Sequence, residues 1–321
     1  MRPVVTRTAT PDDVPLREGS ALAAVAASEG KIDPRLIASL AAVYLIWSST
    51  YLAMRIVVHD LPPLLSAAVR FLLAGGTLFG YALYKGARVP PLRDWLRVAP
   101  VGVFLFVGGN GFVSIASQSI PSGGVAVVCA LMPLWVGVLG FVFGVRPTRR
   151  EWMSLFIGFA GVVFLLGGPS LAGKPIHIVL VILSPMLWAA GSLLSRRTKD
   201  VGGDHASFVG PSLQMLTGGV ALAALALVRG ERFPLDARPT SWLALVYLFV
   251  FGSLLGFTAY AWLLRNTRPT IATSYAYINP ILAVLIGAAL YGEPLGWTTL
   301  IANILIVGAV MLALSGARHR V

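Results

Sequence analysis

PTIATSYAYINPILAVLIGAALYGEP, residues 269–294, is the stretch that decides the fold. It is apolar over about the 20 residues that a helix needs to cross the hydrocarbon core of a membrane. Yet it carries Tyr275, Tyr277 and Asn279 in its first half, followed by Pro280. A proline inside a helix removes a backbone hydrogen bond, so neighbouring groups or water must satisfy the freed carbonyl. Polar groups beside such a break predict a hinge that borders a cavity rather than lipid.

A second stretch has the same design. Residues 121–146 read PSGGVAVVCALMPLWVGVLGFVFGVR and place Pro133 in the middle of an apolar run, 147 residues before Pro280. Trp47, in YLIWSSTYLAMR (44–55), and Trp188, in PMLWAAGSLLSR (185–196), are 141 residues apart. Because both offsets are close to half of the 321 residues, they predict an internal repeat.

The composition is that of a membrane protein with several spans. Apolar residues make up 57% of the chain and charged residues 12%, and the mean hydropathy is +0.81. Soluble domains carry about 25% charged residues. The apolar runs are continuous, which excludes the alternating pattern of a β-barrel. Residues 1–34 are polar and predict a flexible cytoplasmic tail. Ten apolar runs follow, at 36–58, 61–84, 95–116, 123–144, 152–168, 176–195, 208–227, 242–264, 270–291 and 295–314.

The distribution of charge sets the expected topology. The net charge of +12 does not indicate a nucleic-acid partner, because the basic residues are sorted by connection. With the N-terminus inside, 19 lysines and arginines fall on the cytoplasmic side and four on the outer side, as the positive-inside rule requires. We therefore expect an all-α protein of ten transmembrane helices with both termini cytoplasmic. Two five-helix repeats, 35–172 and 173–317, enter from opposite sides because five is odd, and inverted repeats are typical of secondary transporters.

Few residues have the chemistry of an enzyme or a metal site. Cys129 is the one cysteine and lies inside an apolar run, and the four histidines are scattered over run ends, loops and the tail. Clustered thiolates, imidazoles or carboxylates are what a metal site requires. The sequence predicts neither an enzyme nor a bound metal or cofactor.

Several motifs, taken in their order along the chain, resemble those of a known family. WSSTYLAMR (47–55) resembles a first span of tryptophan and small residues that ends in a basic residue, here Arg55. LSAAVRFLLAG (65–75) is similar to the family's arginine-phenylalanine second span, and LWAAGSLLSRR (187–197) to its sixth. TSYAYINPILAVLIGAALYGEPLGW (273–297) carries the strongest match. On these motifs the chain resembles the EamA-like branch of the drug/metabolite transporter superfamily across nearly all of 36–316. One departure is that GVRP (144–147) replaces the glycine-glutamate expected in the first half.

The resemblance implies an exporter of small metabolites, amino acids above all, in the cell inner membrane. Polar and aromatic residues inside the apolar runs suit a cavity for neutral or zwitterionic solutes, including aromatic ones. Three alternatives remain open from the sequence: a carrier of anionic or phosphorylated metabolites, a multidrug exporter, and a membrane scaffold that transports nothing. In small relatives of the superfamily two copies form the transporter. Because this chain contains both halves, we expect a functional monomer with a small-molecule substrate and membrane lipid as its partners.

Arg70 raises two possibilities. It lies about nine residues into its run, roughly 13 Å deep at 1.5 Å per residue, where an arginine must face protein or water. Its guanidinium can brace backbone carbonyls of neighbouring helices, or it can bind a substrate carboxylate or phosphate. The other candidates for the cavity wall are polar or aromatic residues inside apolar runs: Trp47, Ser48, Thr50, Asn110, Trp188, Tyr260, Tyr275, Tyr277 and Asn279. Pro133 and Pro280 are the expected hinges.

The position of the acidic residues bears on energetics. No Asp or Glu lies in the core of an expected span, and Glu293, at the end of the ninth, comes nearest. Proton-coupled carriers usually use an intramembrane carboxylate. The sequence therefore predicts facilitative transport by alternating access. It also predicts a cavity lined by the first, third, fourth, sixth, eighth and ninth spans, with the fifth and tenth peripheral.

Overall fold

The computed structural model describes residues 33–120, 122–144, 147–165, 174–234, 236–282, 301, 304–309 and 312. The chain divides into two compact units, Met1–Ile37 and Ala38–Val321. The first is described only from Asp33, whose carboxylate accepts a hydrogen bond from the backbone N–H of Arg35 at the start of a helix. All regular structure in the described residues is helical.

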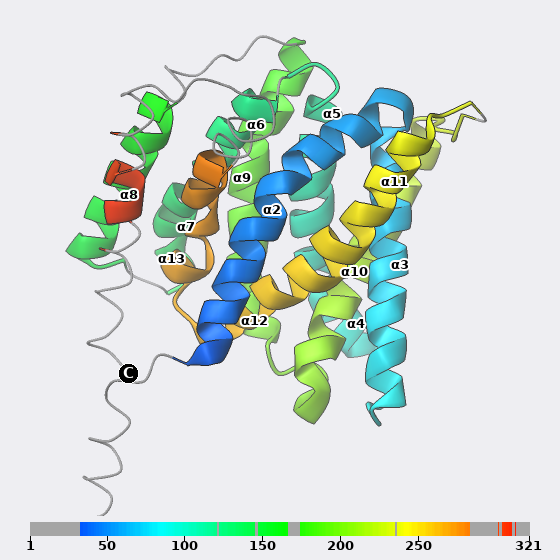
Figure 1. Cartoon of the computed structure of the whole chain (residues 1–321). Coiled ribbons are helices and arrows are strands. Elements are labelled where there is room, and N and C mark those ends of the chain that lie inside the picture. Colours follow the sequence, from blue (N-terminus) through cyan, green and yellow to red (C-terminus); the bar gives the residue numbers. More distant parts are fainter. Residues whose placement is uncertain are drawn as a thin grey trace, which may run out of the picture. The chain divides into compact units, whose positions relative to one another are not determined.

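In the first half, two long helices precede a third that changes its winding (Figure 1). The middle of this third helix is a π-helix, η1, a form rare in proteins and frequent at functional sites. Two short helices and a longer one follow. The elements are α2 (Pro34–Asp60), α3 (Pro63–Tyr84), α4 (Leu92–Gly102), η1 (Val103–Gly111), α5 (Phe112–Ala116), α6 (Ser122–Cys129), α7 (Met132–Gly140) and α8 (Arg149–Leu165).

The second half has the same order of long helices. A second π-helix, η4, lies in the middle of its third long helix. The elements are α9 (Pro175–Ser195), the 3₁₀ turns η2 (Arg196–Thr198) and η3 (Gly203–His205), α10 (Ala206–Val228), α11 (Pro239–Tyr247), η4 (Leu248–Phe257), α12 (Thr258–Asn266) and α13 (Pro269–Ala272). Residues 275–282 are also helical.

Proline and glycine mark several of the helix ends. Pro63, Pro175 and Pro239 each stand in the first turn of a helix, where a missing N–H costs nothing and the fixed φ favours the helical conformation. Gly86 and Gly230 follow α3 and α10 with φ of 94° and 67°. Such left-handed residues end helices, and glycine adopts them without steric cost.

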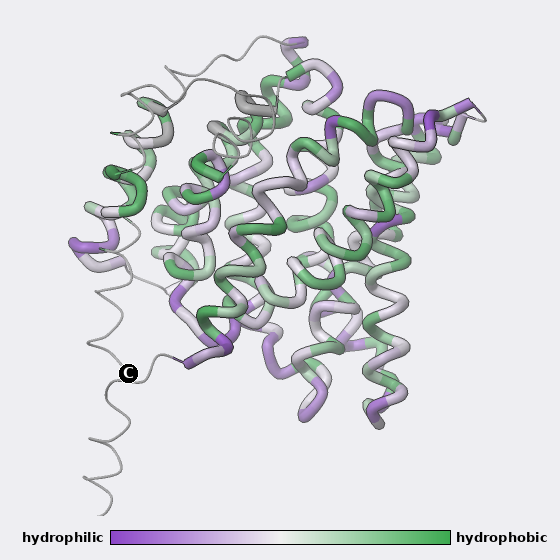
Figure 2. Tube along the Cα trace, viewed as in Figure 1, coloured by the Kyte–Doolittle hydropathy of each residue, from purple (hydrophilic) through white to green (hydrophobic). Residues whose placement is uncertain are grey.

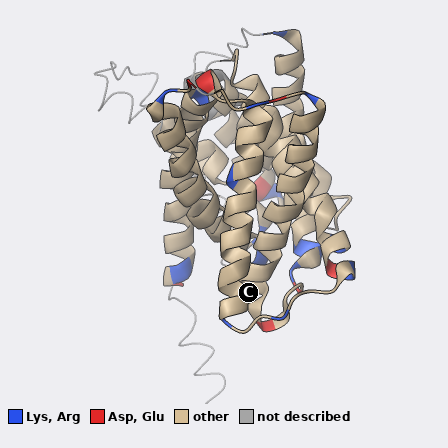
Figure 3. Cartoon of the chain, turned by 90° about the vertical axis from the view of Figure 1, so that its right-hand side faces the viewer, with Lys and Arg blue, Asp and Glu red and all other residues tan. Residues whose placement is uncertain are grey.

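Within the described residues, six helical segments are long and apolar enough to cross a membrane, so the chain is membrane-embedded: Pro34–Asp60, Pro63–Tyr84, Leu92–Ala116, Pro175–Thr198, Gly203–Val228 and Pro239–Asn266. They coincide with the expected first, second, third, sixth, seventh and eighth spans. Figure 2 shows apolar residues along these helices and polar residues near their ends, and Figure 3 shows charged residues mainly at helix ends. Of the other four expected spans, the fourth (123–144) is described throughout as two short helices, and the fifth, ninth and tenth are described only in part.

Close packing of small residues joins the long helices. α10 packs along α3 and α4 (Figure 1). A Cβ on Gly218 of α10 would lie 2.6 Å from the carbonyl oxygen of Gly102 in α4, so the two backbones touch. Within a membrane, where burial of apolar surface cannot drive association, such close contact is a main source of stability.

The fourth and ninth spans are interrupted, but only one of them beside its proline. α6 ends at Cys129 and α7 begins at Met132, so Pro133 stands in the first turn after the break. In the ninth, the interruption is the turn at Thr273–Ser274, and the helix 275–282 runs through Pro280. The structure thus puts the break six residues before the expected hinge. A proline removes one hydrogen bond and can bend a helix without ending it.

Candidate functional site

A cavity lies among the helices that the sequence placed around it. It offers about 80 Å³ to water-sized molecules, room for several waters. The expected first, third, fourth, sixth, eighth and ninth spans all contribute, and α3, which was not expected, contributes as well. The described lining residues are Trp47, Thr50, Tyr51, Met54, Arg70, Phe71, Phe106, Gly109, Asn110, Val113, Cys129, Met132, Ser184, Pro185, Trp188, Gly252, Phe257 and Tyr275.

Four aromatic rings that contact one another form what we call the aromatic floor. Trp47, Trp188 and Tyr275 line the cavity, and Tyr260 packs against all three. The Trp47 ring meets those of Trp188, Tyr260 and Tyr275 at centroid distances of 5.7, 5.0 and 4.7 Å. Tyr260 is fully buried and lies 5.6 Å from Tyr275. Edge-to-face pairs of this kind add about 0.5–1.5 kcal/mol each beyond burial.

Hydrogen bonds hold the floor in place. The Trp47 indole donates from Nε1 to the Gly252 carbonyl at 3.1 Å, and Trp188 Nε1 donates to the Tyr260 hydroxyl at 3.2 Å. The Ser192 hydroxyl also lies 2.7 Å from that of Tyr260. These hydrogen bonds give Trp47, Trp188 and Tyr260 defined ring orientations rather than loose apolar packing.

Each indole packs on a glycine of a π-helix. A Cβ on Gly256 of η4 would overlap Trp47, and a Cβ on Gly109 of η1 would overlap Trp188. The two contacts correspond to each other when the halves are exchanged. The first span of each half packs against the third long helix of the other half: α2 against η4, and α9 against η1. The glycines are therefore required by the close approach of the rings.

Arg70 is buried, with 6% of its surface exposed, and lines the cavity. Its Nε donates to the Ser253 hydroxyl at 2.8 Å, and its Cζ lies 4.3 Å from the centre of the Phe71 ring. Among the described residues no carboxylate pairs with it, and its hydrogen bond goes to a side chain of η4 rather than to backbone carbonyls. The guanidinium is thus fixed at its Nε edge, and no hydrogen bond to a described residue engages its Nη donors.

The other polar residues of the wall are mostly engaged. Thr50 and Ser184 donate to the carbonyls of Trp47 and Gly109, both at 2.8 Å. Asn110 is the exception, because its half-buried side chain lines the cavity and its Oδ1 has no hydrogen-bond partner. An amide can turn either its oxygen or its nitrogen toward a ligand.

Three sequence-predicted candidates do not line the described cavity, and a fourth, Tyr260, lies behind it as part of the floor. Ser48 is buried and donates to the Leu45 carbonyl at 2.8 Å. Tyr277 donates to the Leu155 carbonyl at 2.9 Å and packs against Gly158 of α8. Asn279 is buried, and its side chain lies beside the hydroxyl of Tyr51, a residue of the cavity wall. In this structure the cavity function of these three residues stays a prediction.

Ten lining side chains were missed by sequence reasoning: Tyr51, Met54, Phe71, Phe106, Val113, Cys129, Met132, Ser184, Pro185 and Phe257. Most of them are apolar residues in apolar runs, where cavity-facing and lipid-facing positions look alike. The π-helical winding of η1 and η4 also turns side chains away from the usual 3.6-residue period. Tyr51 and Phe71 directly follow the candidates Thr50 and Arg70, so their sequence neighbours could have indicated them.

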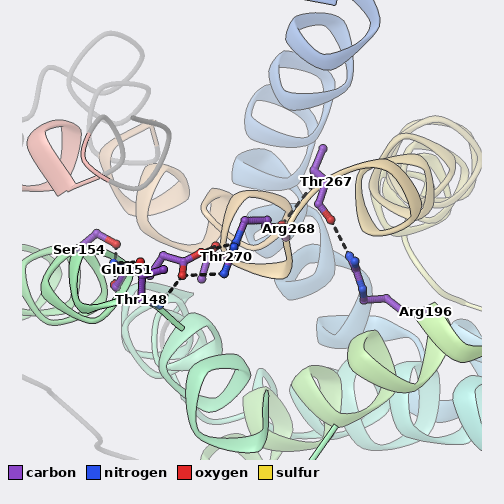
Figure 4. A network of polar contacts seen from close by, with 7 residues as sticks. All are labelled: Thr148, Glu151, Ser154, Arg196, Thr267, Arg268 and Thr270. Carbon is purple, nitrogen blue, oxygen red and sulfur yellow. Dashed lines mark hydrogen bonds and ion pairs between the residues drawn. The ribbon is translucent and has the colours of Figure 1, made fainter. Parts of the chain in front are cut away.

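The connections 85–91, 196–205 and 265–268 lie at one end of the helices, which we call the arginine-rich end. A polar network lies at this end (Figure 4). Glu151, 3% exposed at the start of α8, forms an ion pair with Arg268 at 2.6 Å. Thr270 also donates to its carboxylate at 3.0 Å, and Arg196 donates to the carbonyls of Leu264 and Thr267 at 2.7 and 2.5 Å.

This network, which we call the Glu151 latch, was not predicted. Its local signal is in the sequence, because Thr148 and Glu151 form a capping box. The Thr148 N–H donates to the Glu151 carboxylate at 2.6 Å, and the Glu151 N–H donates to the Thr148 hydroxyl at 3.2 Å. A threonine with a glutamate three residues later is the usual pattern. The partner Arg268, 117 residues away, cannot be inferred from that spacing.

Ion pairs also lie at the opposite end of α2. Arg55 is exposed there, and Asp60 pairs with Arg238 at 2.7 Å and accepts a hydrogen bond from Ser241 at 2.5 Å. The cavity extends from the aromatic floor toward this end, because on α2 the lining runs from Trp47 to Met54. The floor therefore separates the cavity from the arginine-rich end.

Comparison with known proteins identifies the family. The model of the EamA-like transporter family matches residues 35–167 and again residues 175–315, which together cover most of the chain. The chain belongs to the EamA-like transporter family. The resemblance drawn from the sequence motifs is confirmed.

Two relatives of this transporter and one solved structure with a similar fold are informative. It is 40% identical over 283 residues to the "Uncharacterized inner membrane transporter YedA" of Escherichia coli K12, covering 88% of this chain and 91% of the relative. It is 24% identical over 290 residues to the "Probable amino-acid metabolite efflux pump" of Salmonella typhimurium, covering 87% and 94%. A crystal structure superposes on this chain with a TM-score of 0.70 at 22% sequence identity. The match covers 88% of this chain and 97% of the chain in that structure, which shows a shared fold. These relatives are transporters rather than enzymes.

Proposed function

We propose that this transporter exports small neutral metabolites, amino acids above all, by alternating access through the described cavity. The observation that carries the proposal is a cavity with a mixed aromatic and polar wall, bordered by the aromatic floor. Such a wall suits a solute that has an apolar body and a polar head group. The name printed for the Salmonella relative supports the amino-acid class.

The inverted repeat remains our proposal, and three observations support it. The family model matches each half separately. The π-helices η1 and η4 begin at Val103 and Leu248, 145 residues apart, which is between the tryptophan and proline offsets. The Trp47–Gly256 contact corresponds to the Trp188–Gly109 contact when the halves are exchanged. We propose ten spans in two inverted halves, residues 35–172 and 173–317, with both termini cytoplasmic.

In this arrangement the arginine-rich end is cytoplasmic and the structure is closed there. The aromatic floor and the Glu151 latch form two successive barriers, and the cavity extends toward the outer side. Alternation requires the latch to break and the floor to open while the outer end closes. The interruptions at 130–131 and 273–274 provide points of local bending close to the proposed hinges Pro133 and Pro280.

We propose that the transport is facilitative. No acidic residue lies among the described lining residues. The buried Glu151 is held by an ion pair beyond the aromatic floor, away from the cavity wall. Glu293, the acidic residue that the sequence places nearest to a span core, lies outside the described residues. Because a zwitterion carries no net charge, the membrane potential does not drive it.

The alternatives fit the described wall less well. A carrier of phosphorylated compounds needs several cations around its cavity, and Arg70 is the one charged residue among the described lining residues. A multidrug exporter of cations needs an anion there, and the same residues supply none. A scaffold would have no use for an ordered aromatic floor. We also propose a functional monomer, since residues of both halves line one cavity.

Export from cells tests the proposal. Cells that express the wild type and are loaded with phenylalanine through a dipeptide should release it several-fold faster than cells that express Gly109→Leu. That variant fills the space of the Trp188 ring. Equal release from the two cell lines, at equal amounts of folded protein in the membrane, would contradict the proposed function.

A further inference from the structure

The charges of the cavity wall are unbalanced. Arg70 contributes a guanidinium, and no described lining residue contributes a carboxylate. An unpaired cation in a largely apolar site is costly unless a ligand or water compensates it. A zwitterionic substrate therefore meets an opposite charge for its carboxylate and none for its ammonium group.

The orientation of Arg70 suits this use. Ser253 accepts from Nε and the Phe71 ring lies against Cζ, so two neighbours fix the plane of the guanidinium. Nε accounts for one of its five N–H donors. The remaining donors sit on the Nη atoms, which form the planar pair that binds a carboxylate in a bidentate manner.

The surroundings suit an apolar body rather than a second charge. Phe106, Phe257 and Trp188 lie close together, with ring centroids 4.9 Å apart for the two phenylalanines and 6.4 Å for Phe106 and Trp188. For an ammonium ion the described wall offers a neutral amide, that of Asn110, whose Oδ1 has no hydrogen-bond partner among the described residues. A neutral amide binds an ammonium ion far less strongly than a carboxylate would.

We propose that the site selects its substrates by their carboxylate and is nearly indifferent to their amino group. It then accepts monocarboxylates with an aromatic or large apolar body, whether or not they carry an α-amino group, and rejects the corresponding amines. This inference rests on the proposed function, because it assigns the recognition chemistry of the same cavity. It extends the substrate class from amino acids to organic monocarboxylates.

Competition in proteoliposomes tests the inference with the unmodified protein. Counterflow of labelled L-phenylalanine is measured against 3-phenylpropionate, which lacks the amino group, and against phenethylamine, which lacks the carboxylate. We expect 3-phenylpropionate to compete within about 10-fold of L-phenylalanine and phenethylamine to compete about 100-fold more weakly, since a charge-assisted contact is lost. Equal competition by the two analogues would overturn the inference.

Two arginine variants provide a matched pair. Arg70→Gln should weaken the competition by both carboxylate compounds about 10- to 100-fold and leave the competition by phenethylamine unchanged. The variant therefore loses the preference for carboxylates. Arg55→Gln changes the exposed arginine in the neighbouring helix and should keep the selectivity of the wild type. Arg70→Lys retains the charge and should keep part of the preference for carboxylate compounds over phenethylamine. This variant replaces Arg70→Gln in the test if the glutamine variant does not fold. Unchanged selectivity in folded Arg70→Gln would contradict the assignment.

A binding measurement separates failure of this inference from failure of the proposed function. If the wild type shows no phenylalanine counterflow, amino-acid transport is wrong. Thermal stabilisation of the purified protein by 3-phenylpropionate, but not by phenethylamine, would still support the carboxylate site. Stabilisation by phenethylamine alone, or by neither compound, would reject it.

Discussion

Replacing Glu151 by glutamine should open the cytoplasmic end of the cavity. Glutamine keeps the shape of the side chain and removes the charge that pairs with Arg268. Glu151 is 3% exposed and the Arg268 side chain is 29% exposed, so the pair is shielded from solvent on one side only. Removing the charge from one member of a fully buried pair costs about 3–5 kcal/mol. With a partly exposed partner and the amide still able to accept a hydrogen bond, we expect about 2 kcal/mol.

That energy acts on the conformational equilibrium. In our proposal the latch exists only while the cytoplasmic end is closed. Because 1.4 kcal/mol corresponds to a factor of ten, a loss of about 2 kcal/mol shifts the equilibrium about 30-fold toward the form that is open at that end. Transport should continue, since neither the cavity wall nor the floor is changed.

Cys129 provides the assay. It is the one cysteine of the chain and it lines the cavity, so a membrane-impermeant thiol reagent reports access without further mutation. In inside-out vesicles, Glu151→Gln should react up to about 30-fold faster than the wild type, and in right-side-out vesicles it should react more slowly.

The matched control is Asp200→Asn. It removes an ion pair at the same end, where Asp200 is 63% and Arg97 is 39% exposed. An exposed pair contributes about 0.2–1 kcal/mol, so its labelling should stay within a few-fold of the wild type. Unchanged labelling of folded Glu151→Gln from the cytoplasmic side would refute the latch.

Three further predictions concern the floor and the assembly. Gly109→Ala places a methyl group against the Trp188 ring and should cost about 1–3 kcal/mol of stability by overpacking. Thermal unfolding in detergent measures this cost, and Gly80→Ala, where nothing lies within 4 Å, should leave it unchanged. Tyr260→Phe removes the hydroxyl bonded to Ser192 and Trp188 and should lower stability by about 1 kcal/mol and slow export a few-fold. At one chain per liposome the transport per chain should equal that at higher density, and its loss on dilution would contradict the functional monomer.

The sequence predicted the parts of the fold and site that depend on local pattern. Six expected spans coincide with long apolar helices. Trp47 and Trp188, singled out for their repeated positions, meet in the floor. Arg70 was recognised because a buried charge needs a partner, but Ser253, 183 residues away, could not be identified from the pattern.

The sequence missed features that depend on distant packing. Proline suggested a break at Pro280, whereas the described turn lies at 273–274. The π-helical winding of η1 and η4 could not be predicted, because in an apolar run only the glycines hint at it. Glu151 was passed over because it stands outside the span core, and its burial follows from Arg268 and Thr270 in the other half of the chain.

Counterflow in proteoliposomes of the purified protein tests the central claim most directly. Vesicles loaded with unlabelled L-phenylalanine are diluted into a trace of labelled L-phenylalanine, with no ion or pH gradient across the membrane. The account predicts transient accumulation of label inside. It also predicts that an imposed pH gradient leaves this accumulation unchanged and that alkylation of Cys129 in the cavity abolishes it. Label that only equilibrates, as it does in vesicles without protein, would contradict the claim that this chain is a carrier of such solutes.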